Sequence, residues 1–142
     1  MERQGPVIVI EDDEDDQYLF EQAYRRLNLS NELIFFSNCQ EALEYLRSTS
    51  EIPFLIMSDV NMSDMSGFDL RAHIHIDAAI HDKCIPYLFF STAASQRMVI
   101  DAYGMSVQGF FVKPVSMDAL ERTIRTIVDY WQLCAAPNNY PA

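Results

Sequence analysis

The chain has 142 residues, 49% of them hydrophobic and 22% charged, which is typical of one globular domain with a sizeable buried core. Its ten basic and 21 acidic residues give a formal net charge of −11. Such a surface repels phosphate backbones and anionic lipids, which argues against direct binding to nucleic acid or to a membrane. A divalent cation or a basic protein surface fits this charge better.

The sequence carries no sign of export. No apolar stretch approaches the length of a membrane span, and the opening MERQGPVIVI has only four apolar residues where a signal peptide needs a longer run. Cys39, Cys84 and Cys134 are odd in number and form no CxxC pair, so we expect free thiols rather than disulfides or zinc ligands. These features predict a cytoplasmic protein.

Five short apolar runs predict five buried strands. They are VIVI (7–10), LIFF (33–36), FLIM (54–57), YLFF (87–90) and FFV (110–112). Each run is almost continuously apolar, as in strands that helices cover on both faces.

Helical patterns separate these runs. Four residues after the first run have the spacing of one buried helix face: Phe20, Ala23, Tyr24 and Leu27. Further helices are expected after Cys39, after Gly67, at about 94–105 and at about 117–134. The alternation predicts an α/β fold, a doubly wound five-stranded parallel sheet in one domain over 1–134. Residues 135–142 have no periodicity and are expected to form a flexible tail.

The residues that follow each predicted strand are the candidate site, because ligands of open parallel sheets bind beyond the carboxyl ends of the strands. The polar residues at these places are Glu11 and Asp12, Asp59, Ser91 and Thr92, and Lys113. Carboxylate oxygens suit Mg²⁺, and a phosphoryl group in transit needs a metal together with a cation or hydroxyl. A carboxylate can itself accept the phosphoryl group. The pattern therefore predicts a magnesium site in which one acid is the nucleophile.

Two other groups of residues receive simpler interpretations. The acids at 13–16 (DEDD) are read as solvated residues at a helix start, where the helix dipole favours negative charge. His73, His75 and His81 are expected at the surface, since residues two apart do not share a helix face and no cysteine lies at zinc-ligand spacing.

Four segments in combination resemble the receiver domain of response regulators in two-component signalling: VIVIEDD, LIMSDVNMSDMSG, YLFFSTA and GFFVKP. They occur in the family's order and near its spacing, and the resemblance runs from about 7 to 131. It implies a flavodoxin-like (βα)5 fold with strand order 2-1-3-4-5. It also implies a phosphorelay switch, a stand-alone response regulator of the chemotaxis type, because about ten residues follow the last predicted helix.

The resemblance assigns a role to each candidate at the metal. Asp59 would be the phosphoacceptor and would also touch the Mg²⁺. Asp12 would ligate the metal directly, Glu11 largely through a bound water, and Asn61 through its backbone carbonyl. Lys113 would pair with a phosphoryl oxygen.

The resemblance also implies how the switch works. Ser91 would be the switch hydroxyl, and Phe110 the aromatic residue that changes rotamer on activation. The chain would not be an enzyme in the usual sense, since it would catalyse only its own phosphorylation and a slow autodephosphorylation. Ala93 offers no polar group to hold an attacking water, which favours slow loss of the phosphoryl group. A cis bond before Pro114 belongs to the same resemblance.

Two positions depart from the family pattern. Ser63 replaces the usual proline in the loop after Asp59, and Ser106 replaces the usual glycine before the last strand. Neither touches the chemistry, but both bear on how rigid these loops are.

The implied partners are a sensor histidine kinase or phosphotransfer protein and a downstream target protein. The target would bind the face formed by the helix at 94–105, the strand at 110–112 and the helix at 117–134. A homodimer through the same two helices stays open.

Two other functional classes remain as alternatives. A phosphatase resembling the haloacid dehalogenase superfamily also uses Asp, Lys, Ser or Thr and Mg²⁺, but its nucleophile follows the first strand as DxDx[T/V], and EDDEDDQ lacks the Thr or Val. A phosphorylation-independent interaction module would not need Asp59, Lys113 and the acidic pair together.

Overall fold

A computed structural model describes residues 3–141 of the chain. Met1 and Glu2, which belong to the predicted domain, and Ala142, the end of the predicted tail, lie outside the described residues. The described part contains a five-stranded parallel sheet in the order β2-β1-β3-β4-β5, which is the predicted order. The strands are β1 (Val7–Ile10), β2 (Leu33–Phe36), β3 (Leu55–Ser58), β4 (Tyr87–Ser91) and β5 (Gly109–Val112).

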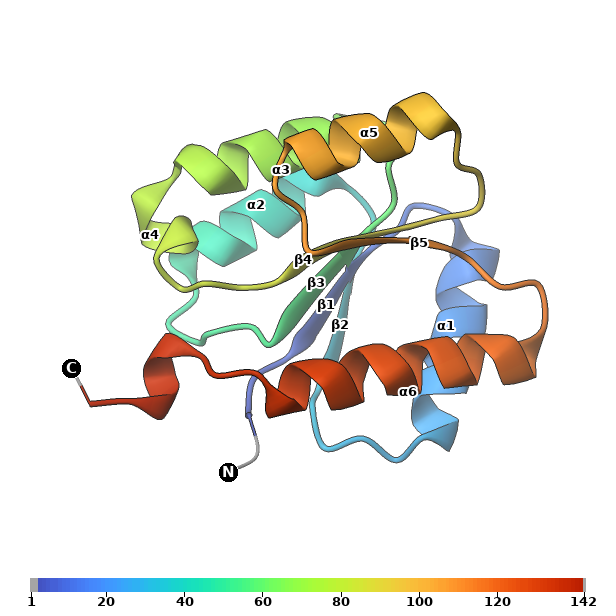
Figure 1. The fold of residues 1–142 in the computed structure, drawn as a ribbon, viewed down its shortest axis with the longest axis horizontal. Coiled ribbons are helices and arrows are strands. Elements are labelled where there is room, and N and C mark those ends of the chain that lie inside the picture. Colours follow the sequence, from blue (N-terminus) through green and yellow to red (C-terminus); the bar gives the residue numbers. More distant parts are fainter. Residues whose placement is uncertain (1–2, 142) are drawn as a thin grey trace.

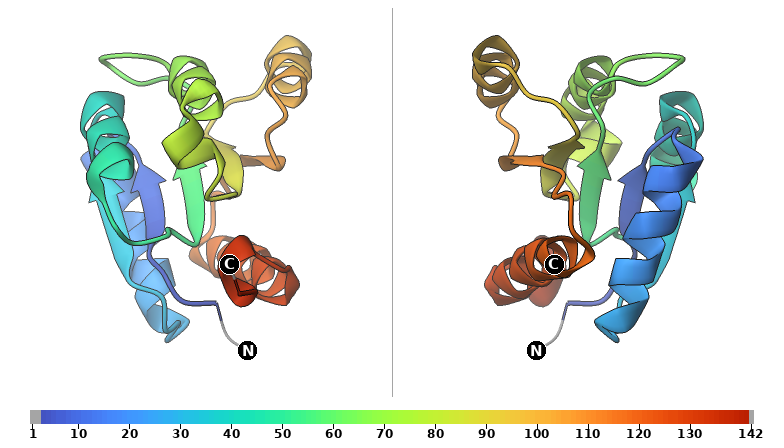
Figure 2. Two further views of the ribbon diagram at one scale, coloured as in Figure 1. Left: turned by 90° about the vertical axis from the view of Figure 1, so that its left-hand side faces the viewer. Right: turned by 90° about the vertical axis from the view of Figure 1, so that its right-hand side faces the viewer.

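Helices cover both faces of this sheet (Figures 1 and 2). The helices α1 (Glu14–Arg26) and α6 (Met117–Leu133) lie side by side on one face. The other face carries α2 (Cys39–Ser48), α3 (Gly67–Ile76), the short α4 (Ala78–His81) and α5 (Gln96–Gly104). A 3-10 turn, η1 (Pro137–Asn139), follows α6.

Alternating side chains of the strands supply two separate cores. In β1, Ile8 and Ile10 pack toward α2 and α3, whereas Val7 and Val9 pack toward α1 and α6. In β4, Phe89 packs in the same core as Ile8 and Phe90 in the same core as Val7. Because each strand is buried on both faces, its sequence is apolar throughout, as the runs indicated.

The starts of the α-helices within residues 3–141 follow local sequence rules. At each start a side-chain oxygen accepts a hydrogen bond from a backbone N–H of the first turn, which satisfies a donor that the helix leaves free. The capping residues are Asp13, Asn38, Ser66, Asp77, Ser95 and Ser116.

The structure corrects the sequence prediction at two places. Asp77 caps a second, four-residue helix directly after α3, so a helix that was not expected stands between α3 and β4. No peptide bond within 3–141 is cis, so the Lys113–Pro114 bond is trans and differs from the family resemblance.

The structure of the turn before β5 shows how Ser106 can replace the usual glycine. Ser106 has a φ of 58°, a left-handed conformation that glycine usually provides. The buried side chain of Arg71 donates hydrogen bonds to the carbonyl oxygens of Met105 and Ser106, at 3.2 Å and 3.0 Å. These hydrogen bonds from α3 stabilise the left-handed turn, so that a residue other than glycine can occupy it.

Within residues 3–141 we find no helix that combines the length and the apolar character needed to cross a bilayer.

Candidate functional site

The backbone ladder brings three candidate residues to one edge of the sheet. Ile10 pairs with Ser58, and the Asp59 N–H donates to the Ile10 carbonyl at 3.1 Å, so Glu11 and Asp59 leave neighbouring strands at the same level. Lys113 N–H donates to the Ser91 carbonyl at 2.8 Å, which places Lys113 beside β4. This edge is formed by the carboxyl ends of the strands, as predicted.

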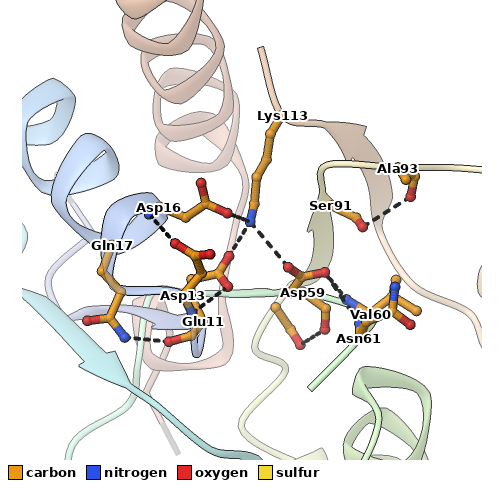
Figure 3. Close-up of polar contacts among 11 residues, drawn as sticks. Glu11, Asp13, Asp16, Gln17, Asp59, Val60, Asn61, Ser91, Ala93 and Lys113 are labelled. Atoms are coloured by element: carbon orange, nitrogen blue, oxygen red, sulfur yellow. Dashed lines mark hydrogen bonds and ion pairs between the residues drawn. The ribbon is translucent and has the colours of Figure 1, made fainter. Parts of the chain in front are cut away.

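The Lys113 side chain reaches across this edge into a group of carboxylates (Figure 3). Its Nζ lies 3.0 Å from Oδ2 of Asp16 and 3.2 Å from Oδ2 of Asp59, and it also donates to Oε1 of Glu11. One ammonium therefore serves three carboxylates, which leaves a formal charge of −2 on the four groups. This excess negative charge attracts a further cation.

Burial strengthens these interactions. The side chains of Glu11 and Lys113 are 5% and 15% exposed. Burial raises the pKa of Glu11, and the bond from Lys113 only partly offsets this effect. Burial by itself would lower the pKa of Lys113, but the hydrogen bonds to Glu11 and Asp16 outweigh it and raise that pKa. Lys113 therefore carries its positive charge at neutral pH.

The Asp59 carboxylate has a fixed orientation. Its Oδ1 accepts hydrogen bonds from the backbone N–H groups of Val60 at 2.7 Å and Asn61 at 3.3 Å, while Oδ2 faces Lys113. A Cβ at Gly67 would collide with the Asp59 carbonyl oxygen, so the loop can close against α3 only with glycine there. The backbone of Asn61 therefore lies next to the Asp59 carboxylate.

Asp12 lies apart from the group around Lys113. Its side chain is exposed, and its charge acts on Cys39 instead. Burial, followed by the charges of Asp64, Asp12 and Asp69, raises the pKa of the Cys39 thiol to about 12. No three His, Cys, Asp or Glu side chains in the described chain are arranged to hold a metal ion. Mg²⁺ usually takes only one or two carboxylates and completes its octahedron with water, so the oxygen donors present still suit it.

Ser91 lies beside the site, and Phe110 of β5 pairs with Phe89 of β4. The Ser91 hydroxyl is buried and donates to the Ala93 carbonyl at 3.1 Å, so it turns away from Asp59 (Figure 3). The Phe110 ring is partly buried, with its centroid 5.8 Å from that of Phe89.

Sequence reasoning missed the contacts of two acids, one in the site and one in the loop after Asp59. The sequence predicts a solvated Asp16, but the carboxylate of Asp16 binds Lys113. It stands four residues before Phe20 and so extends the buried stripe of α1 by one turn, which was the available signal. Asp64 caps α2 from the loop after Asp59, accepting from Cys39 N at 3.1 Å and Gln40 N at 2.9 Å. No pattern in the sequence indicates that contact.

A cavity of about 310 Å³ adjoins the acidic group between α1 and the loop after β5. Its polar wall contains Glu11, Asp16, Asp59 and Lys113, and its other walls are mainly apolar, from Leu19, Phe20, Phe90, Val115 and Leu120. The Asp59 carboxylate is thus reachable from outside although it is only 11% exposed.

The sequence matches the family described as the response regulator receiver domain over residues 7–125. The chain belongs to this family. It is 25% identical over 137 residues to the probable methanogenesis regulatory protein FilR2 of Methanothrix harundinacea, covering 92% of this chain and 87% of that protein. It is 30% identical over 101 residues to the chemotaxis protein CheY-3 of Vibrio cholerae, covering 66% and 74%.

A third relative and two solved structures are also similar to the chain. The response regulator Rcp1 of Synechocystis is 23% identical over 88% of this chain and 87% of its own. Among solved structures, the phosphorylated cyanobacterial phytochrome response regulator RcpA has a TM-score of 0.83 at 22% identity, over 95% of this chain and 99% of its own. The Mn²⁺-bound form of Rcp1 has a TM-score of 0.76 at 22% identity, over 93% and 99%. These structural likenesses establish the receiver fold.

Proposed function

We propose that this receiver domain is a phosphorylation-driven switch, with Asp59 as the phosphoacceptor. The observation that carries the proposal is the Lys113 ammonium lying between Glu11, Asp16 and Asp59 at the carboxyl edge of the sheet. A phosphohistidine of a sensor kinase or phosphotransfer protein would be the donor. A carboxylate oxygen of Asp59 forms the new O–P bond, the N–P bond breaks, and the imidazole leaves with that electron pair.

Mg²⁺ is the metal that this site would use. Asp12, Asp59 and the backbone carbonyl of Asn61 would hold it directly, and Glu11 largely through a bound water. Support comes from their hard oxygen donors, the excess negative charge, and the Mn²⁺-bound form of the similar protein Rcp1. When bound, the metal neutralises charge on the phosphoryl group during transfer.

The switch would operate through Ser91 and Phe110. The new phosphoryl group competes for the Ser91 hydroxyl, which leaves the Ala93 carbonyl and donates to a phosphoryl oxygen. Phe110 then turns into the space that Ser91 vacates. The outcome is a population shift on the surface formed by α5, β5 and α6, where a target protein reads the state or a second copy of the chain binds. Ile100, Tyr103 and Val112 are exposed apolar residues of that surface.

A cytoplasmic location is part of the proposal. Cys39, Cys84 and Cys134 are all free thiols, as expected in a reducing compartment. The switch would catalyse only its own phosphorylation and a slow autodephosphorylation, as Ala93 suggests.

Phosphoramidate, whose P–N bond mimics phosphohistidine, tests this function. After incubation with Mg²⁺, borohydride reduction converts an aspartyl phosphate to homoserine, which peptide mass analysis locates. We expect homoserine at position 59 in stoichiometric amount. Modification at another acid, or continuous turnover of a phosphomonoester such as p-nitrophenyl phosphate, would contradict the proposal and favour a phosphatase.

A further inference from the structure

Lys113 is shared unequally among its three carboxylates. Its Nζ is nearer to Glu11 and to Asp16, at 3.0 Å, than to Asp59, at 3.2 Å. A lysine ammonium has three N–H donors, and these three acceptors use all of them. The cation is therefore held on the α1 side of the site (Figure 3).

The first turn of α1 presents Asp16 rigidly. Asp13 caps the helix by accepting from the Asp16 backbone N–H at 3.0 Å. The Gln17 side chain donates to the Glu11 carbonyl and also to the Ser37 hydroxyl at 3.3 Å. These contacts tie the turn to the ends of β1 and β2, so the Asp16 carboxylate stays beside Lys113.

A phosphoryl group on Asp59 requires a donor that Lys113 has already committed. The bond to Asp59 is exchanged for one to a phosphoryl oxygen, which lies beyond the carboxylate, so Nζ must move away from Glu11 or from Asp16 as well. The Asp16 side chain is 29% exposed and that of Glu11 only 5%, so water can replace Lys113 at Asp16 with the smaller desolvation cost. The bond to Asp16 is thus the one to be given up.

We propose that Asp16 is a positioning residue, which holds the Lys113 ammonium back from Asp59 and releases it when the phosphoryl group is present. This inference rests on the proposed function. Asp16 thereby restrains the switch, because the energy of the Lys113–Asp16 interaction is lost when the phosphorylated state forms. Asp16 accordingly weakens binding of the phosphoryl group and shortens its lifetime.

The comparison of Asp16→Asn with Asp15→Asn tests the restraint. Both changes remove one negative charge from the first turn of α1, but only Asp16 binds Lys113. Each variant is titrated with beryllofluoride, a phosphoryl mimic, in the presence of Mg²⁺, and binding is followed by ¹⁹F NMR. We expect Asp16→Asn to bind about threefold or more tightly than Asp15→Asn. Its aspartyl phosphate should decay more slowly by a similar factor. Asp16→Glu, which keeps the carboxylate, should remain near the wild type.

A second readout follows Lys113 directly in the unliganded protein. The chain has only two lysines, Lys83 and Lys113, so ¹⁵N-lysine labelling gives two Nζ signals that Lys83→Arg assigns. Asp16→Asn should shift the Lys113 signal, whereas Asp15→Asn should leave it in place.

Three results discriminate between the accounts. Equal or weaker beryllofluoride binding by Asp16→Asn, relative to Asp15→Asn, would overturn the restraint. An unchanged Lys113 signal would overturn the contact itself. If the wild type bound no beryllofluoride, the proposed function would fail and the release step with it, while the Nζ comparison would still show whether Asp16 holds Lys113.

Discussion

Nζ of Lys113 lies 3.2 Å from Oδ2 of Asp59, although the two residues are 54 positions apart in the chain. Parallel strands explain this proximity. Both residues follow the carboxyl end of a strand, and the register of β3, β4 and β5 brings those ends together. The same edge carries Glu11, and the charge balance among these residues leads to the first prediction.

Lys113→Met should destabilise the fold at neutral pH by about 1–3 kcal/mol, because it leaves the buried Glu11 carboxylate without its cation. The pKa of Glu11 is already raised, and loss of Lys113 raises it further, so the carboxyl takes up a proton more readily as the pH falls. The loss should therefore be smaller at pH 5 than at pH 7. Urea unfolding at both values measures it.

Lys83→Met is the matched control for this experiment. Lys83 donates to the backbone carbonyl of Thr49 at 3.1 Å and leaves no carboxylate behind when removed. Its effect should not depend on pH between 5 and 7. If the Lys113→Met loss were also independent of pH, the ion pair with Glu11 would not be the source of the stability.

Asp64→Asn tests the loop that follows Asp59. Burial opposes ionisation of Asp64, but backbone N–H groups of Gln40, Met65 and Cys39 outweigh it and lower the pKa of this carboxyl. A lowered pKa means that the stabilisation is present above the ordinary value near 3.8 and is lost as the pH falls through the folded value. We expect a cost of about 1 kcal/mol at pH 7. Thermal melting from pH 7 to pH 3 should show this cost disappearing toward acid.

Asp69→Asn provides the comparison for Asp64→Asn. Asp69 is an exposed acid in the first turn of α3, so its removal should change stability by only a few tenths of a kcal/mol. If both substitutions changed the stability equally, Asp64 would not stabilise the start of α2. A larger effect of Asp64→Asn would show that the cap on α2 steadies a loop that has Ser63 in place of proline.

Tyr24→Phe tests the packing of α1 at alkaline pH. The Tyr24 hydroxyl is buried and donates to the Asn31 carbonyl at 2.7 Å, and burial raises the pKa of the phenol from 10 to about 12. The folded state therefore keeps a proton that the unfolded chain loses above pH 10, so stability falls between pH 10 and pH 12. Tyr24→Phe should cost about 1 kcal/mol at pH 7 and show a shallower decline over this window. Chemical unfolding at several pH values measures this. If the free energy of unfolding of the wild type and of Tyr24→Phe fell equally between pH 10 and pH 12, Tyr24 would not be the source of the decline.

Sequence pattern was a good guide to the sheet. The runs at 7–10 and 33–36 coincide with β1 and β2. The strands β4 and β5 are one residue longer than their runs at one end, and β3 is shifted from its run by one residue. Double-sided burial makes such strands apolar throughout, so their positions are visible in composition alone. The helix α4 was missed because four residues are too few to display a helical period, and only its cap at Asp77 signals it.

The site was predictable where it depends on strand ends and less so where it depends on loops. Glu11, Asp59 and Lys113 are placed by the sheet itself, and the structure brings them together. Asp16 depends on which face of the first turn of α1 points inward, and Asp64 on how the loop after Asp59 folds. Those tertiary choices are not encoded in local spacing.

The metal roles of Asp12 and Asn61, and the switch roles of Ser91 and Phe110, stay predictions. Asp12 is exposed, and the Ser91 hydroxyl donates to Ala93, so both side chains would have to rearrange when metal and phosphoryl group bind.

Intact-protein mass after incubation with acetyl phosphate tests the central claim most directly. The wild type and Asp59→Asn are compared with and without Mg²⁺. We predict a single phosphoryl increment that requires both Mg²⁺ and Asp59. An increment on folded Asp59→Asn protein, or none on the folded wild type with Mg²⁺ present, would contradict the assignment of Asp59 as phosphoacceptor.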